Sequence, residues 1–338
     1  MSTAAILGCA GERLSADERA LFAETRPAGF ILFRHNCADP AQVRDLVADV
    51  RDCVGDPAAP VMIDQEGGRV TRLPSPPWRH PPPAATFGTL AQTDPTAACR
   101  AVWRNARLIA AELADLGITV NTLPVLDLPT TTADPAIGDR AFGADPGRAA
   151  ALGRAVSDGL LAGGVAPVMK HLPGHGRARA DSHHTLPVVD APWADLAAHD
   201  LRPFVELADL PWAMTAHVAY TAMDAGVPAT TSAAVIRTAI REHMGVDGVL
   251  VSDDLGMAAL GGTMRERGGA AIAAGCDLVL ACSRDLEDRR AALDGAGELS
   301  EATAARLASA ETRRRREADG GVDRAALRDV LEADLGAV

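Results

Sequence analysis

Short hydrophobic runs alternate with longer amphipathic stretches along most of the chain. The runs are rich in Val, Ile and Leu and are continuously apolar, which is typical of strands that are covered on both faces. Turn-forming residues and polar segments separate them. There are eight such runs, at 3–8, 29–33, 60–64, 118–126, 165–170, 211–215, 247–252 and 276–281.

The stretches between these runs have the periodicity of helices. Eight alternations of strand and helix predict an α/β fold, a parallel sheet closed into a (β/α)8 TIM barrel. We expect one catalytic domain over residues 1–338, with 296–338 as a helical C-terminal extension packed on the barrel. The proline cluster at 74–83 predicts a stiff surface loop rather than a domain boundary. The predicted helices are 15–24, 40–53, 95–116, 145–162, 193–208, 231–243, 264–274 and 285–295.

Composition narrows the classes of function. The net charge is −12, which argues against nucleic acid or an anionic membrane as the main partner. No stretch has the length and apolar character of a membrane span, and the N-terminus does not resemble a signal peptide. No pair of the six cysteines has CxxC spacing, which favours free thiols in a reducing compartment. We therefore expect a cytoplasmic protein.

Polar residues gather where the predicted strands end. Asp64 ends the third run, Lys170 and His171 end the fifth, His217 follows the sixth and Asp253 follows the seventh. In barrel enzymes the chemistry lies at the carboxyl ends of the strands. Four polar strand ends converging on one mouth therefore predict a functional site rather than a set of unrelated caps.

The segment KHLPGHGRARADSHH, residues 170–184, holds four of the nine histidines. A zinc site is one reading, but the spacing is poor for it. His171 and His175 are separated by Pro173 and Gly174, so they cannot share a helix face, and no HExxH motif occurs. We expect no metal and no other cofactor.

An acid/base site is the other reading of this segment. Asp181 and His183 are two residues apart, so the carboxylate can hold one imidazole nitrogen while the other exchanges a proton. Alone, such a triplet is usually an ordinary polar turn. Asp253 at a strand end suits a nucleophile or an electrostatic stabiliser, whereas Asp254 suits a helix cap.

Several blocks of the chain together carry a resemblance to a known family. The segment KHLPGHGRARADSH is similar to the signature of family 3 glycoside hydrolases of the β-N-acetylglucosaminidase type, with Leu172 in place of Phe or Ile. The resemblance spans roughly residues 5 to 283. The other matching blocks, in the same order as in the family, are IDQEGGRVTRL (63–73), IGDRAF (137–142), MTAHV (214–218) and VSDDLGM (251–257), with weaker support from GFILFRHN (29–36) and AGCDLVL (274–280).

The resemblance implies a role for each matching residue. Asp253 matches the nucleophile, His183 the general acid/base and Asp181 its dyad partner. Arg69 lies in one of the blocks and is expected to support the site from behind. The residues that match the family's sugar-binding positions are Asp64, Arg72, Arg140, Lys170 and His171.

The resemblance also implies an activity. It indicates a retaining exo-β-N-acetylglucosaminidase that removes non-reducing terminal GlcNAc from peptidoglycan-derived muropeptides in cell-wall recycling, through a covalent glycosyl-Asp intermediate. The partner would be a GlcNAc-containing muropeptide or small saccharide, with no nucleic acid and no membrane, and the protein a monomer. Three alternatives stay open: a family 3 β-glycosidase for another sugar, a GlcNAc phosphorylase, and a metal-dependent barrel hydrolase.

Overall fold

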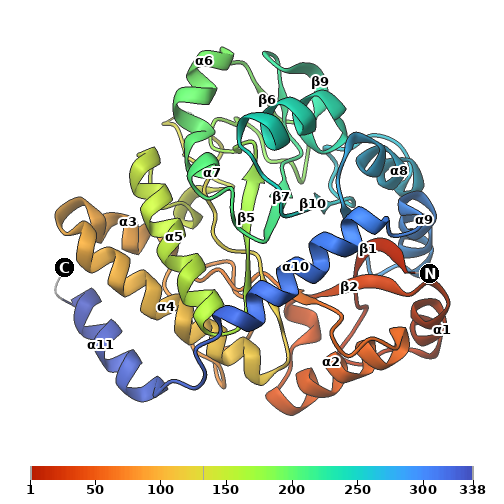
Figure 1. Cartoon of the computed structure of the whole chain (residues 1–338), viewed down its shortest axis with the longest axis horizontal. Coiled ribbons are helices and arrows are strands. Elements are labelled where there is room, and N and C mark those ends of the chain that lie inside the picture. The colour runs from red at the N-terminus through yellow and green to blue at the C-terminus, as the bar shows by residue number, and fades with distance from the viewer. Residues whose placement is uncertain (1, 132, 337–338) are drawn as a thin grey trace.

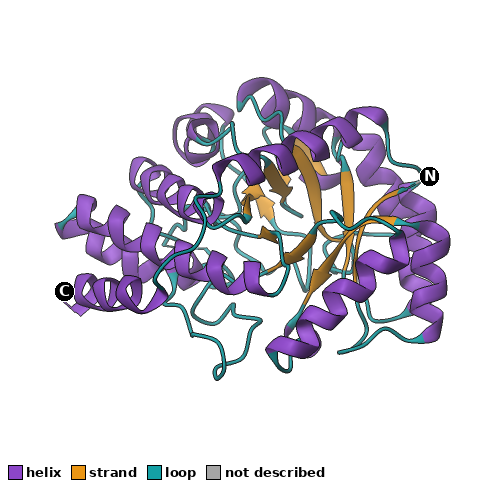
Figure 2. Cartoon of the chain, turned by 60° about the horizontal axis from the view of Figure 1, so that its bottom comes forward, coloured by secondary structure: helices purple, strands orange, loops and turns teal. Residues whose placement is uncertain are grey.

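The computed structural model describes residues 2–131 and 133–336. Its centre is a closed barrel of eight parallel strands, which Figure 2 shows surrounded by helices. The (β/α)8 barrel expected from the alternating pattern is therefore confirmed. In spatial order around the barrel, the strands are β1 (Thr3–Gly8), β11 (Leu278–Ala281), β10 (Val249–Asp254), β7 (Trp212–Thr215), β5 (Ala166–Leu172), β4 (Val120–Asn121), β3 (Val61–Ile63) and β2 (Pro27–Leu32).

Helices follow the strands and cover the outside of the barrel (Figure 1). Several begin with a capping side chain: Ser15 and Thr263 each form a capping box, and Asp39 caps a helix that begins with proline. The helices after the strands are α1 (Ala16–Thr25), α2 (Pro40–Val54), α4 (Pro95–Asp115), α5 (Pro146–Ala162), η5 (Val235–His243), α8 (Met264–Ala274) and α9 (Leu286–Ala296).

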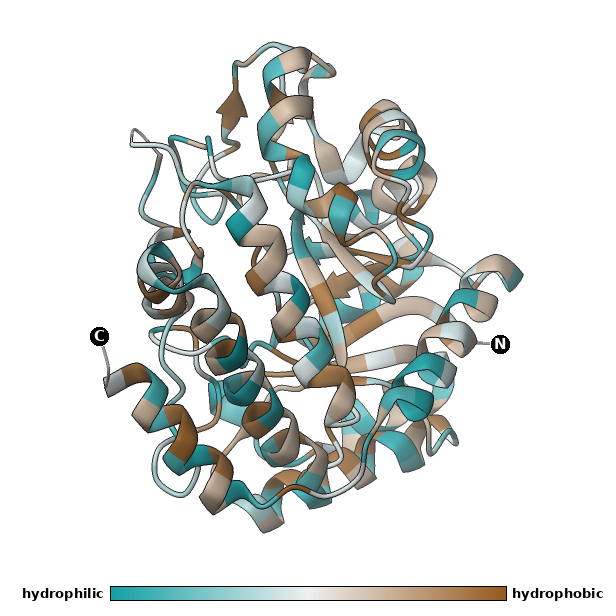
Figure 3. Ribbon diagram, turned by 60° about the vertical axis from the view of Figure 1, so that its left-hand side comes forward, coloured by the Kyte–Doolittle hydropathy of each residue, from teal (hydrophilic) through white to brown (hydrophobic). Residues whose placement is uncertain are grey.

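The barrel strands are buried over almost their whole length, as continuous apolar runs require. β5 is buried at all seven positions, including Lys170 and His171 at its carboxyl end. The helices carry apolar and polar segments in alternation (Figure 3). Within the described part of the chain, no helix is both long enough and apolar enough to cross a membrane.

Three local features differ from the expected pattern. The fourth strand is only Val120–Asn121, and the Asn121 side chain bonds to the backbone of Gln65. The chain beyond it bonds to β5 irregularly, for example Leu126 N to Lys170 O at 2.9 Å. The predicted helix 193–208 is broken into three short pieces. Elements with no counterpart in the prediction are α3 (Ala84–Thr93) and a small sheet of β6 (Val188–Val189), β8 (Ala219–Tyr220) and β9 (Asp224–Pro228).

The C-terminal segment forms α10 (Glu301–Glu317) and α11 (Arg324–Gly336). In Figure 1, α10 crosses the barrel and α11 lies beside α4. The basic residues of α10 pair within the chain: Arg314 and Arg315 both bind Glu311. These arginines therefore form a helix face whose charge is balanced by an acidic residue of the same helix.

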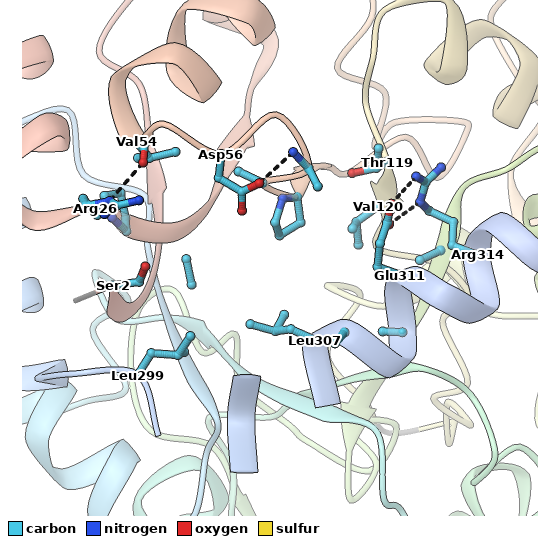
Figure 4. A pocket seen from close by; sticks show the side chains of 18 of the residues that line it. Ser2, Arg26, Val54, Asp56, Thr119, Val120, Leu299, Leu307, Glu311 and Arg314 are labelled. Atoms are coloured by element: carbon cyan, nitrogen blue, oxygen red, sulfur yellow. Dashed lines mark hydrogen bonds and ion pairs between the residues drawn. The ribbon is translucent and has the colours of Figure 1, made fainter. Parts of the chain in front are cut away.

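A cavity of about 400 Å³ lies between α10 and the amino ends of the barrel strands (Figure 4). Pro27, Ala166 and Trp212, the first residues of three strands, line it together with Leu307. The arginines at its edge are already bonded within the chain, Arg26 to Val54 O and Arg314 to Gly164 O.

Candidate active site

A second cavity, of about 200 Å³, lies at the carboxyl ends of the strands. It brings together segments that are far apart in the sequence: the block after β3, the 136–140 loop, the end of β5, the 175–183 loop and the end of β10. All eight predicted site residues line it, namely Asp64, Arg72, Arg140, Lys170, His171, Asp181, His183 and Asp253. The larger cavity at the other end of the barrel has no comparable convergence of ionisable groups.

Asp64 lies beside two cations on the floor of this cavity. Its Oδ2 accepts a hydrogen bond from Arg72 Nη2 at 2.8 Å and its Oδ1 accepts one from Thr122 Oγ1 at 2.5 Å. Lys170 Nζ lies 3.6 Å from Oδ1. Burial raises the pKa of Asp64, but the charges of Lys170 and Arg72 and the hydrogen bonds from Thr122 and Arg72 together outweigh this and lower it, so the carboxylate stays ionised.

Glu66 is a functional candidate that the sequence reasoning missed. It accepts a bidentate pair from Arg140, with both distances 2.8 Å, and lies 2.5 Å from Lys170 Nζ. Burial raises its pKa, but Lys170 and then Arg140 outweigh this and lower it to about 2. Its position two residues after Asp64 was the available signal, because alternate residues share a side of an extended chain.

Asp127 is the second residue that sequence reasoning missed. Its side chain is fully buried, and its Oδ2 lies 2.7 Å from His171 Nδ1. Its Oδ1 accepts the backbone N–H of His175 at 2.6 Å. Asp127 directly follows the fourth apolar run, so the strand-end rule that selected Asp64 and Asp253 would also have selected it.

Asp253 is the last residue but one of β10 and faces the cavity. Its Oδ1 accepts the backbone N–H of Asp254 at 2.8 Å. Burial raises the pKa of Asp253, but the neighbouring His171 and His217, this N–H group and Lys170 together bring it below its ordinary value. An ionised carboxylate in this position can act as a nucleophile.

His217 supports β10 from behind. Its Nε2 lies 2.9 Å from the carbonyl oxygen of Asp254, which only accepts, so this nitrogen is the donor. Burial lowers the pKa of His217. Its Nδ1 lies 2.7 Å from Thr230 Oγ1. The backbone beside Asp253 is therefore held by a hydrogen bond from His217.

Asp181 and His183 meet in a turn on the rim of the cavity. Asp181 Oδ1 accepts the backbone N–H of His183 at 2.9 Å and lies 2.7 Å from its Nδ1. Burial raises the pKa of Asp181, but these hydrogen bonds and the charge of His183 lower it overall. An ionised carboxylate only accepts, so Nδ1 carries the proton and Nε2 is left free.

The remaining residues of interest have clear places. Arg69 binds Asp139 and the carbonyl oxygens of residues 135–137, so it fixes the loop that carries Arg140. His175 lines the cavity beside His171, whereas His184 is largely exposed and lies 4.0 Å from Asp181. Among the described residues, no group of three or more His, Cys, Asp or Glu side chains has the arrangement of a metal site.

This geometry defines a class of protein, a barrel hydrolase with a carboxylate and an imidazole facing one small polar pocket. Comparison with known proteins agrees. The model of the glycosyl hydrolase family 3 N-terminal domain matches residues 4–314. The β-hexosaminidases of Bordetella avium and Methylococcus capsulatus are 39% and 40% identical to this chain, over 82% and 81% of its length and 80% of theirs.

Two solved structures extend the comparison. The family 3 β-N-acetylglucosaminidase from a Paenibacillus species is 32% identical, with a TM-score of 0.87 over 98% of this chain and 67% of that one. NagZ from Neisseria gonorrhoeae, in complex with N-trifluoroacetyl-D-glucosamine, is 29% identical, with a TM-score of 0.84 over 99% and 97%. The chain belongs to glycoside hydrolase family 3. Within it, the chain is an enzyme of the β-N-acetylhexosaminidase type.

Proposed function

We propose that this enzyme is a retaining exo-β-N-acetylglucosaminidase that removes terminal GlcNAc from peptidoglycan-derived muropeptides. One observation carries the proposal: a single cavity is lined by Asp253, by the Asp181–His183 pair and by the five residues expected to bind the sugar. These five are Asp64, Arg72, Arg140, Lys170 and His171. At about 200 Å³ it is smaller than the usual pocket for a drug-sized ligand and suits a single sugar ring. A pocket of this size favours cleavage of one terminal sugar.

The cavity floor would position the sugar. Asp64 and Glu66 offer acceptors to sugar hydroxyls, and Lys170, Arg72 and Arg140 offer donors. Each of these groups is already held by an oppositely charged neighbour. Because their orientation is fixed before the substrate binds, little entropy is lost when they engage it. The substrate's anomeric carbon would then face Asp253.

The first chemical step would join the sugar to Asp253. The Asp253 carboxylate attacks the anomeric carbon as the glycosidic bond breaks, and an ester to the sugar forms. A doubly protonated His183 gives its Nε2 proton to the departing oxygen. Asp181 stabilises the imidazolium before this transfer and keeps Nδ1–H in place afterwards. The leaving group departs as a neutral alcohol.

The second step would release the sugar. His183, now neutral, accepts a proton through Nε2 from a water molecule, which attacks the anomeric carbon and displaces Asp253. Two inversions give net retention of configuration. Retaining enzymes usually use two carboxyl groups, and here an imidazole on a loop takes the place of the second.

Two further observations support the substrate class and setting. One structural relative binds an N-acylglucosamine analogue, and another is itself a β-N-acetylglucosaminidase. All six cysteines are free thiols, which suits a reducing compartment, and we propose a cytoplasmic, monomeric enzyme.

Trapping with a fluorinated GlcNAc analogue, followed by mapping of the labelled peptide, tests the mechanism. We expect the label on Asp253. A label on another residue, or none while the enzyme turns over GlcNAc substrates, would overturn the covalent mechanism.

Comparing p-nitrophenyl β-GlcNAc with the β-glucoside tests the sugar. We expect a clear preference for GlcNAc, and equal rates would refute the proposed specificity.

Adding phosphate to the reaction tests the acceptor. No GlcNAc-1-phosphate should form, since water is the proposed acceptor.

A further inference from the structure

The fully buried carboxylate of Asp127 lies between the two halves of the site. One half is the end of β5, where His171 faces the cavity, and the other is the loop that carries Asp181 and His183. Asp127 follows a segment that runs along β5, with Leu126 N bonded to Lys170 O at 2.9 Å. Its side chain is completely shielded from solvent.

On the first side, Asp127 determines the tautomer of His171. Burial raises the pKa of Asp127, but His171 and His175 lower it to about 2, so it only accepts hydrogen bonds near neutral pH. His171 Nδ1, 2.7 Å from Oδ2, must therefore carry a proton. The Nε2 atom of His171 is left for the cavity that holds Asp253.

On the second side, Asp127 fixes the base of the loop. Its Oδ1 accepts the His175 N–H at 2.6 Å, and Tyr220 Oη donates to Gly174 O at 2.8 Å nearby. The His175 ring in turn contacts the next turn of the loop, because its Nε2 lies 3.4 Å from Ser182 Oγ. Both His175 and Ser182 are buried.

Ser182 stands between Asp181 and His183, and its hydroxyl lies toward His175. It is buried while the side chain of His183 is 66% exposed. Its carbonyl oxygen accepts Ala259 N–H at 3.1 Å, which ties the turn to the segment that follows Asp253. The turn is thus docked on one side to the nucleophile's element and on the other to Asp127 through His175.

We propose that Asp127 is a positioning residue that orients His171 for the sugar and, through His175 and Ser182, places His183 over the leaving-group oxygen. This role rests on the proposed acid/base function of His183. Asp127 itself does not touch the substrate. Its effect is therefore transmitted by two arms, one to His171 and one to the loop.

The dependence of kcat/KM on the leaving group distinguishes the effect on His171 from the effect on the loop that carries His183. A 2,4-dinitrophenyl β-GlcNAc needs no proton to leave, whereas a methylphenyl β-GlcNAc does. Asp127→Asn should lower kcat/KM for both, by about tenfold more for the methylphenyl substrate. Ser182→Ala should lower only the methylphenyl rate, by about tenfold. Equal losses on the two substrates, or no loss in either variant, would refute the proposal.

Two matched variants control for burial. Asp277 is a buried carboxylate that pairs with Arg241 and Arg306 away from the cavity, and Ser157 is a buried hydroxyl bonded to Gly153 O within α5. Asp277→Asn and Ser157→Ala should leave the ratio of the two rates unchanged. If they shift it as much as the test variants do, the effect is general destabilisation and the proposal fails.

Nitrogen-15 NMR of the histidine rings gives a readout that does not need activity. Wild-type His171 should be protonated on Nδ1, and Asp127→Asn should move the proton to Nε2 by offering an NH2 donor. A wild-type ring protonated only on Nε2 would overturn the proposal even if Asp127→Asn fails to fold. If the wild-type enzyme does not cleave β-GlcNAc, the proposed function fails, while the tautomer still tests the His171 arm.

Discussion

Lys170 on the cavity floor is fixed by ion pairs and a hydrogen bond. Its side chain is almost completely buried and lies within hydrogen-bond or ion-pair distance of Thr122, Glu66 and Asp64. A buried cation is tolerated only where such partners replace water. The same arrangement fixes the donors and acceptors that a sugar would meet. If these groups bind the sugar as proposed, stability and substrate binding depend on the same contacts.

Replacing Asp253 tests the nucleophile at the residue scale. Asp253→Asn should lower kcat on p-nitrophenyl β-GlcNAc by roughly 10⁴-fold or more, since the amide cannot form the ester. Steady-state assay of the purified variant measures this. Asp190→Asn, an exposed carboxylate outside the cavity, should keep wild-type activity. A nearly active Asp253→Asn enzyme would exclude Asp253 as nucleophile.

Replacing Glu66 tests the buried ion pairs. Glu66→Gln should destabilise the fold by about 3 kcal/mol at neutral pH, because Lys170 and Arg140 lose a charged partner. Urea unfolding followed by circular dichroism measures the free energy of unfolding. Glu287→Gln, at an exposed position of α9, should change it little.

The ion pairs of Glu66 also predict how the free energy of unfolding depends on pH. The pKa of Glu66 falls from 4.5 to about 2 on folding. Its contribution is therefore complete above pH 4.5 and is lost as the pH falls toward 2, because the unfolded chain takes up the proton first. Between these values the wild type should lose unfolding free energy more steeply than Glu66→Gln. Parallel slopes would contradict this.

At the scale of elements, the base of the 172–184 loop is a close backbone contact. A Cβ atom on Gly176 would lie 2.0 Å from Leu128 O, and Thr130 N donates to Gly176 O at 3.0 Å. Only glycine allows the loop to approach the segment after β4 this closely. These contacts hold the first part of the loop in place.

Gly176→Ala tests this contact. The substitution should destabilise the protein by about 1–3 kcal/mol through overpacking. It should also lower kcat by up to about 100-fold, because the loop bearing His183 is displaced. Thermal unfolding and steady-state kinetics measure the two effects. Gly269→Ala in α8, where the added Cβ would lie 3.6 Å from Gly295 O of α9, an ordinary contact distance, serves as control and should reduce neither.

At the scale of the whole molecule, the C-terminal helices are joined to the barrel layer by packing and ion pairs. Arg107 of α4 is buried and donates to Asp319 and to Gly320 O, between α10 and α11. Leu331 on the inner face of α11 is 3% exposed, whereas its neighbour Val330 is 44% exposed. Neither lines the active-site cavity.

Leu331→Ala should therefore separate stability from catalysis. We expect a loss of about 2 kcal/mol with kcat and KM unchanged, since the cavity created lies beside α4. Val330→Ala should have little effect on either. Differential scanning calorimetry and assay of the same samples measure both. A changed KM in Leu331→Ala would show that α11 is coupled to the site.

The fold was predictable from the sequence because it follows from local pattern. Eight apolar runs separated by helical stretches leave few arrangements other than a closed parallel barrel. The rule that barrel enzymes carry their chemistry at the carboxyl ends of the strands placed Asp64, Lys170, His171 and Asp253 at one mouth. The matching motifs added Arg72, Arg140 and the Asp181–His183 pair, and the structure brings all eight to one cavity. Their roles remain predictions.

Only the tertiary structure identified the partners that fix these side chains. The positions of Glu66 and Asp127 near strand ends were visible in the sequence, but their partners were not. Glu66 pairs with Arg140 and Lys170, and Asp127 with His171, across 44 to 104 residues of chain. His175 and His184 look alike in the sequence, yet one lines the cavity and the other faces solvent. The sequence by itself determined the barrel and which ionisable residues gather at its mouth, since both follow local pattern and motif. The charge pairing that orients that chemistry depends on distances across the barrel, which only the folded chain defines.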